Sequence, residues 1–68
     1  MDDVYRGYRV AIKFIDGMWT ASIFSVRGPK VFLTARAASS EGAAICAARA
    51  RETIDRYLAY LSTDEGEP

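Results

Sequence analysis

The chain has 68 residues, with nine basic and nine acidic side chains, so its formal net charge is zero. A chain of this length forms one small domain that hides only roughly 60% of its unfolded surface, so oligomerisation would support it. The zero charge argues against a strongly basic nucleic-acid binder, the single cysteine excludes an internal disulfide, and the absence of histidine argues against a zinc cluster. No cofactor is expected.

The lone cysteine, the start of the chain and its apolar stretches predict a soluble, cytoplasmic protein. The opening "MDDVYRGYRV" is acidic and lacks the apolar segment of a signal peptide, and no apolar stretch is long enough to span a membrane. The last seven residues, "STDEGEP", carry three acids and no base. We therefore expect one domain over residues 1–68, ordered over about 5–61, with a solvated acidic tail at 62–68.

An Asp-Gly pair predicts a β-hairpin. Side chains alternate from Tyr8 to Ile15 as in a half-buried strand, and a second strand follows from Met18 to about Val26. Asp16-Gly17, between them, has the composition of a type I′ turn. This turn sets a register in which large apolar residues face each other, with the pairs Ile15–Met18, Phe14–Trp19, Ile12–Ala21 and Val10–Ile23.

A third strand and a helix are predicted to follow. "RGPK", residues 27–30, is typical of a turn, and the strand then covers about Val31 to Ala37 with Val31, Leu33 and Ala35 directed inward. Ser39 or Ser40 would cap the helix, with Glu41 in its first turn and its end near Leu61.

The predicted helix has one apolar stripe and one charged face. The stripe consists of Ala43, Ala47, Ala50, Ile54, Tyr57, Leu58 and Leu61. The charged face offers the i,i+4 pairs Arg51–Asp55 and Glu52–Arg56. Because the stripe is alanine-rich at its start and bulky at its end, we expect the helix to approach the sheet closely at first and more distantly later.

Together these elements predict an α+β fold: a three-stranded antiparallel meander with one C-terminal helix packed on one face (β-β-β-α). A catalytic role is not expected, because the chain has no histidine and no Gly-rich phosphate loop, and its acids are scattered. Asp16 is interpreted as a turn residue. Cys46, beside the apolar stripe, is interpreted as a small buried side chain, with a reactive thiol as the alternative.

The sheet face away from the helix is the candidate interaction surface. Its predicted residues are Arg9, Lys13, Met18, Thr20, Ser22, Phe24, Phe32 and Arg36. Exposed aromatic and apolar side chains of this kind indicate a protein interface, either on this face or along an edge strand, and a homodimer is the leading expectation. The alternative is a nucleic-acid-binding module, since basic and aromatic side chains interleaved on a sheet bind single strands by stacking and phosphate contacts.

From residue 5 to residue 61 the order of features resembles the HicB-like antitoxin N-terminal domain. The resemblance lies in the first strand "YRVAIKF", the hairpin "DGMWTASI", a turn at Gly28 and the helix "SSEGAAICAARARETIDRYLAYL". It implies a β-β-β-α fold, self-association, and a non-catalytic domain that binds and neutralises a small toxin ribonuclease.

Three departures limit what the resemblance implies. The family's Pro-x-x-Pro-Gly-Cys-like segment is "SVRGPK" here, its Gly-Asp-Thr lead into the helix is "RAASS", and its DNA-binding module has no counterpart in these residues. Binding to an operator is therefore not expected. Double-stranded-RNA-binding domains share the β-β-β-α core, but "SSEGAA" lacks their lysine-rich helix start.

Overall fold

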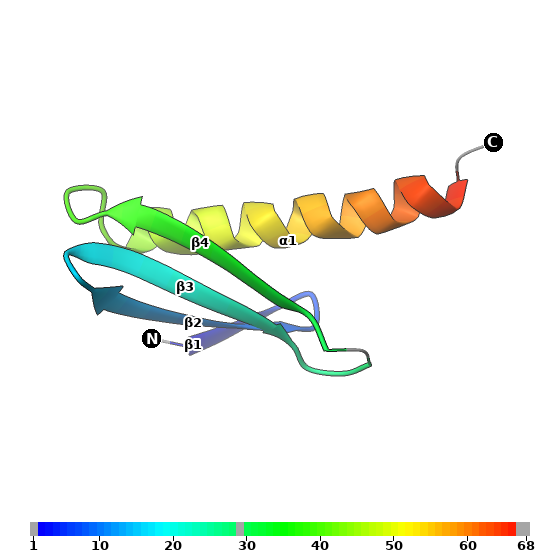
Figure 1. Ribbon diagram of the computed structural model, residues 1–68, viewed down its shortest axis with the longest axis horizontal. Coiled ribbons are helices and arrows are strands. Elements are labelled where there is room, and N and C mark those ends of the chain that lie inside the picture. The colour runs from blue at the N-terminus through cyan, green and yellow to red at the C-terminus, as the bar shows by residue number, and fades with distance from the viewer. Residues whose placement is uncertain (1, 29, 67–68) are drawn as a thin grey trace.

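The computed structural model describes residues 2–28 and 30–66, the last four of these by their backbone alone. One antiparallel sheet of four strands, in the order β1-β2-β3-β4, carries a single helix on one face (Figure 1). The elements are β1 (Asp2–Tyr5), β2 (Tyr8–Ile15), β3 (Met18–Ser25), β4 (Phe32–Ala38) and α1 (Ala43–Gly66). The α+β class and the C-terminal helix are confirmed, whereas the expected number of strands was one too few.

The β2–β3 hairpin has the predicted register. Ile15 faces Met18, Phe14 faces Trp19, Ile12 faces Ala21 and Val10 faces Ile23. Asp16 (φ 51°) and Gly17 (φ 79°) both adopt the left-handed conformation that a type I′ turn requires. The rings of Phe14 and Trp19 pack 5.0 Å apart, so the turn and the cross-strand pair support the same alignment.

Strand β1 was missed by the sequence analysis. It pairs with β2 so that Tyr5 faces Tyr8 across a turn at Arg6-Gly7. Both turn residues have positive φ, 52° at Arg6 and 84° at Gly7. Arginine rarely occupies such a position, which favours Asn, Asp or Gly. The sequence of this turn therefore does not predict a hairpin. As a result, the sheet has an edge strand, starting at Asp2, that was not expected.

Strand β4 begins and ends one residue later than predicted, at Phe32 and Ala38. The prediction of its faces is confirmed for Leu33 and Ala35, which lie half-buried and pack against the core, whereas Phe32 and Arg36 are exposed. Val31, also predicted to point inward, precedes the strand. Ala37, on the helix side, is 1% exposed.

The helix starts later and ends later than predicted. Residues 39–41 form a turn, closed by a 2.9 Å bond from the Glu41 amide to the Ala38 carbonyl. Gly42 (φ 90°) precedes the helix, and its carbonyl accepts the amide of Cys46. The expected cap at Ser39 or Ser40 and the placement of Glu41 in the first turn are therefore wrong. The helix also continues from Leu61 to Gly66, so most of the expected tail is helical; residues 67–68 lie outside the described residues.

The core lies between α1 and the middle of the sheet. It comprises Val10, Ile12, Ala21, Ile23 and Ala37 from the strands and Cys46, Ala50 and Ile54 from the helix. Small residues in the first half of α1 let it lie close to β4, and the helix then diverges from the strands (Figure 1), as its composition predicted. Leu61, the last member of the predicted stripe, is consequently 42% exposed.

Polar contacts of α1 differ in part from the predicted pairs. Glu52–Arg56 forms, at 3.2 Å. The predicted Arg51–Asp55 pair does not form, because both residues bind the β1 hairpin instead. Asp55 pairs with Arg6 at 2.7 Å, and Arg51 pairs with Asp3 at 3.4 Å. These contacts tether the additional strand to the helix.

Candidate functional site

All eight residues predicted for the interaction surface lie on the sheet face opposite α1, which we call the open face. Residues directly opposite each other in neighbouring strands share a face. The register places Phe24 between Arg9 and Phe32, and Thr20 between Lys13 and Arg36. Met18 lies at the end of the face, opposite Ala38. Arg9, Lys13, Met18, Phe24, Phe32 and Arg36 are all exposed.

One end of the open face is apolar. The register adds Val4, which the sequence analysis missed together with β1, to the row that contains Phe24 and Phe32. Their exposed fractions are 58%, 37% and 64%, respectively. The Phe24 and Phe32 rings stack with their centroids 6.1 Å apart and their planes 23° apart. A large apolar cluster this accessible is unusual for a side of a protein that stays in water.

A shallow hollow continues this apolar end toward the β3–β4 turn. It measures about 330 Å³ and is lined by Phe24, Ser25, Lys30, Val31 and Phe32. Among its lining residues, Lys30 carries an ammonium group that can pair with an acid, and Phe24 and Phe32 carry apolar rings. The hollow therefore suits a partner side chain with both apolar and acidic character.

The remaining part of the open face is basic. Arg9, Lys13 and Arg36 form no ion pair with any residue that the structure describes, and each is exposed. Asp2 is the acid that the register places on the same face, opposite Ala11. The open face thus combines a positive charge with an apolar cluster, although the whole chain is neutral.

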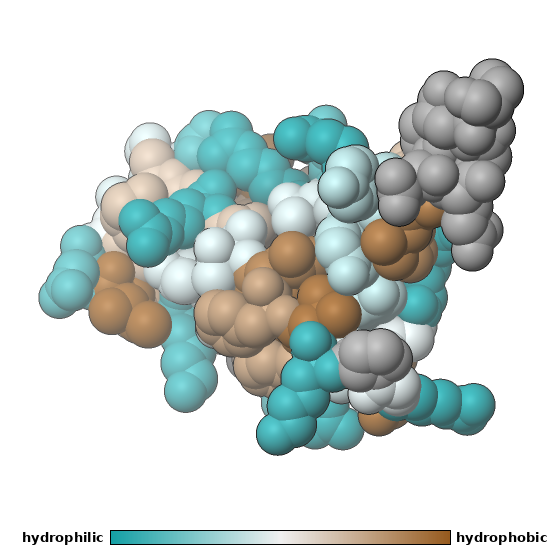
Figure 2. All heavy atoms as spheres, turned by 45° about the vertical axis from the view of Figure 1, so that its right-hand side comes forward, coloured by the Kyte–Doolittle hydropathy of each residue, from teal (hydrophilic) through white to brown (hydrophobic). Residues whose placement is uncertain are grey.

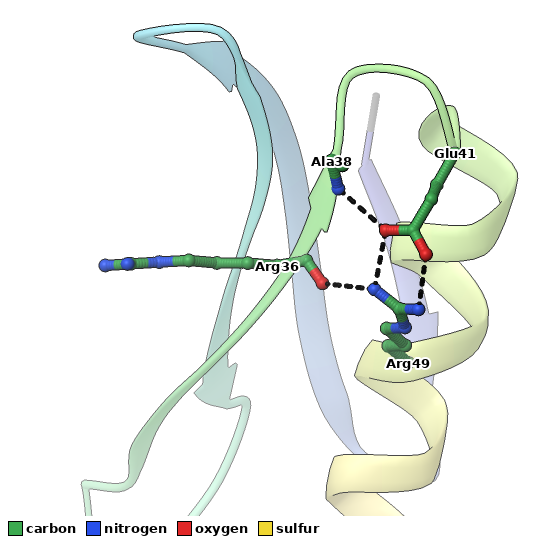
Figure 3. A network of polar contacts seen from close by, with 4 residues as sticks. All are labelled: Arg36, Ala38, Glu41 and Arg49. Carbon is green, nitrogen blue, oxygen red and sulfur yellow. Dashed lines mark hydrogen bonds and ion pairs between the residues drawn. The ribbon is translucent and has the colours of Figure 1, made fainter.

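The free edge of β4 is closed at one end by two side chains (Figure 3). Glu41 Oε1 accepts a 2.8 Å bond from the Ala38 amide, and Arg49 Nη1 donates a 3.1 Å bond to the Arg36 carbonyl. Glu41 and Arg49 also bind each other, at 2.9 and 2.6 Å. The hydrogen bonds from Arg49 and from the Ala38 amide lower the pKa of Glu41 below its ordinary value.

The middle of the β4 edge has no such cover. The Ser25 amide donates to the Val31 carbonyl, so alternation directs the backbone groups of Leu33 and Ala35 toward β3 and those of Phe32 and Thr34 outward. Within residues 2–28 and 30–66, the outward groups of Phe32 and Thr34 have no hydrogen-bond partner. Figure 2 shows hydrophobic side chains gathered here, between the helix and the turn that leads into β4.

A second concave feature lies on the helix side of the sheet. This groove between β1 and α1 measures about 280 Å³ and is lined by Asp2, Asp3, Tyr5, Val10, Ile12, Ala44, Ala47 and Arg51. Tyr5 closes one wall: its hydroxyl donates to Asp55 at 3.0 Å, and the Arg51 guanidinium lies 5.9 Å from its ring centroid. These groups bind one another and hold β1 to the helix.

The described residues hold no group of three or more side chains of His, Cys, Asp or Glu that could bind a metal ion. Cys46 is fully buried, and this burial raises the pKa of its thiol. The interpretation of Cys46 as a buried packing residue therefore agrees with its position. Within the described part of the chain, α1 lacks the apolar character that a helix needs to cross a membrane.

Comparisons with known proteins do not assign a family or a function to this chain. No protein-family model, curated protein or solved structure matches the chain significantly. The resemblance to HicB-like domains therefore stays a prediction.

Proposed function

We propose that this chain is a non-catalytic protein-interaction domain whose binding surface is the open face of its sheet. One observation carries the proposal: Phe24 and Phe32 form an exposed apolar cluster with stacked rings, and Val4 is exposed in the same row beyond Arg9, on a sheet face that no other part of the described chain covers. Clusters of this kind are typical of surfaces that another protein covers.

The charges of the open face indicate what kind of protein surface would bind it. Arg9, Lys13 and Arg36 share the open face with the apolar cluster and form no ion pair with the described residues. A complementary protein surface would have an apolar patch with carboxylates beside it. The resemblance to HicB-like domains suggests a small toxin as this partner, and we retain it as the first protein to test.

Self-association is part of the proposal. The Cα radius of gyration is 12.9 Å, whereas a compact domain of this length has about 11 Å. An elongated monomer of 68 residues buries little apolar surface and benefits from a second copy. We therefore expect a homodimer that covers part of the exposed apolar cluster.

Light scattering after size exclusion tests this proposal. The unmodified chain should elute with the mass of a dimer, and Phe32→Asp should shift it toward a monomer. Tyr60→Asp is the matched control, because Tyr60 is 67% exposed, as accessible as Phe32 at 64%, but lies on the helix. A monomer at every concentration, or equal effects of both substitutions, would refute the proposed surface.

Nucleic-acid binding is the second candidate, favoured by three cations that share the open face with exposed rings and form no ion pair with the described residues. The test is fluorescence anisotropy with a single-stranded RNA at rising salt, comparing the chain with the variant Arg9→Gln, Lys13→Gln, Arg36→Gln. This candidate requires binding that weakens steeply with salt and is lost in the variant. Binding that is absent, or unchanged in the variant, rules it out.

A further inference from the structure

The β4 edge offers one uncapped stretch of backbone next to its closed end. Glu41 and Arg49 occupy the Ala38 amide and the Arg36 carbonyl, whereas the outward amides and carbonyls of Phe32 and Thr34 are left without partners among the described residues. An edge of this kind is a template for another strand. We propose that two copies of the chain join antiparallel along β4, so that their sheets become continuous.

Self-pairing at the other edge is disfavoured. Strand β1 has four residues, its Val4 amide is already bonded to Asp3 at 2.8 Å, and it carries two adjacent acids, Asp2 and Asp3. Two copies of β1 side by side would bring these like charges together. Strand β4 has no acid, and its charged residue is Arg36.

The capped groups restrict the register. If the two-fold axis passes beside Leu33, Phe32 faces Thr34 of the second copy, and the free amides and carbonyls of both residues find partners within the uncapped stretch. If the axis passes beside Thr34 instead, Phe32 needs the Arg36 carbonyl of the second copy, which Arg49 occupies. The first register therefore uses the free groups and leaves the Glu41–Arg49 cap intact.

This pairing completes the binding surface of the proposed function, on which the inference rests. Phe32 lies beside the shared edge and Phe24 one strand further in, so the rings of both copies would form one aromatic strip across the joined sheets. Each copy thus contributes residues to a surface that neither has alone. Lys30 and Arg36 of the two copies would also face each other, so added salt should strengthen the dimer by screening.

The decisive variant is Thr34→Pro, with Thr34→Val as its control. Proline removes the outward amide of Thr34 without removing a bond to β3, whereas valine keeps that amide. Sedimentation velocity over a concentration series should show that Thr34→Pro raises the dimer dissociation constant about tenfold or more, while Thr34→Val leaves it nearly unchanged. Equal dissociation constants for the two variants would overturn edge pairing.

A cross-linking measurement tests the register and does not depend on proline being tolerated. In a Cys46→Ala background, Leu33→Cys places thiols opposite each other at the two-fold axis, whereas Ala35→Cys places them apart. Mild oxidation should yield a covalent dimer with Leu33→Cys and little with Ala35→Cys. Cross-linking that is equal for both, or absent for Leu33→Cys, contradicts this register.

The variants separate the two proposals. If Phe32→Asp weakens the dimer but Thr34→Pro does not, the open face is the interface and pairing through the β4 edge is wrong. If the chain is a monomer throughout the series, both self-association and edge pairing are wrong. If Thr34→Pro and Phe32→Asp both weaken the dimer and Leu33→Cys cross-links, the edge-paired dimer is established.

Discussion

Glu41 and Arg49 form a two-pronged ion pair, at 2.9 and 2.6 Å, that bonds the end of the β4 edge to helix α1. Each side chain also binds a backbone group of β4, Glu41 the Ala38 amide and Arg49 the Arg36 carbonyl. The same pair therefore links turn, helix and strand, and limits where another strand could be added. Bidentate contacts of this kind are more directional than ordinary surface ion pairs.

Replacement of Glu41 should lower stability in a pH-dependent way. The hydrogen bonds from Arg49 and the Ala38 amide lower the pKa of Glu41 from its ordinary 4.5. The charged carboxylate thus stabilises the folded state above pH 4.5, and this contribution is lost as the pH falls through the lower folded-state pKa. Urea unfolding should show Glu41→Gln less stable than the unmodified chain at neutral pH, with the difference disappearing in acid.

Glu52→Gln is the control for this measurement. Glu52 pairs with Arg56 at 3.2 Å on the exposed side of the helix, an arrangement that contributes little. Its replacement should change the free energy of unfolding much less than Glu41→Gln does. If the two substitutions have equal effects, or if the effect of Glu41→Gln persists in acid, the cap does not have the role described.

Asp55 should determine how firmly β1 is held. It accepts hydrogen bonds from Arg6 at 2.7 Å and from the Tyr5 hydroxyl at 3.0 Å. Asp55→Ala removes both bonds, so the amide of Val10, which faces β1, should exchange with solvent several-fold faster. The amide of Ala11, which faces β3, should be unaffected. Equal acceleration at both amides would indicate general destabilisation rather than release of β1.

Gly17→Val should destabilise the chain through its backbone alone. Gly17 has φ 79°, and a Cβ atom built there has no neighbour within 4 Å, so no clash contributes. A left-handed L-residue costs about 1–2 kcal/mol, and a β-branched one lies toward the upper end. Chemical denaturation should detect this loss, whereas D-alanine at the same position, introduced by synthesis, should preserve stability. A neutral Gly17→Val would contradict the type I′ turn.

The Cys46 thiol should be unreactive in the folded chain. It is fully buried, and burial raises its pKa, so the nucleophilic thiolate is scarce at neutral pH. A thiol reagent such as a dinitrobenzoate disulfide should react slowly with the native protein and rapidly after unfolding in urea. Fast labelling of the native protein would support the alternative of a reactive thiol.

The hairpin and the open face could be predicted because their signals are local. Asp16-Gly17 selects one turn type, and strict alternation in β2 and β3 then assigns each side chain to a face. Val4 was not predicted, because its strand β1 depends on the Arg6-Gly7 turn, whose sequence is unusual for a hairpin. Contacts of Tyr5 and Arg6 with Asp55 hold this strand in place. Such contacts join residues far apart in the chain, where no spacing rule applies.

The helix start and the edge cap could not be predicted for a related reason. Ser39, Ser40 and Glu41 have the composition of a helix cap, but Glu41 instead binds the Ala38 amide behind it. Its second partner, Arg49, becomes a neighbour only once α1 folds back along β4. The residue types of this segment correctly predicted a boundary between β4 and α1. They wrongly predicted that its polar side chains cap the helix.

The central claim, that the open face and its β4 edge bind a second copy of the chain, is tested most directly by concentration-dependent amide spectra. In ¹H–¹⁵N correlation spectra of the labelled chain, the signals of Phe24, Phe32 and Thr34 should shift with increasing concentration. Those of Glu52 and Arg56, on the exposed side of α1, should stay in place. Spectra that do not change with concentration, or shifts centred on the helix, would contradict the account.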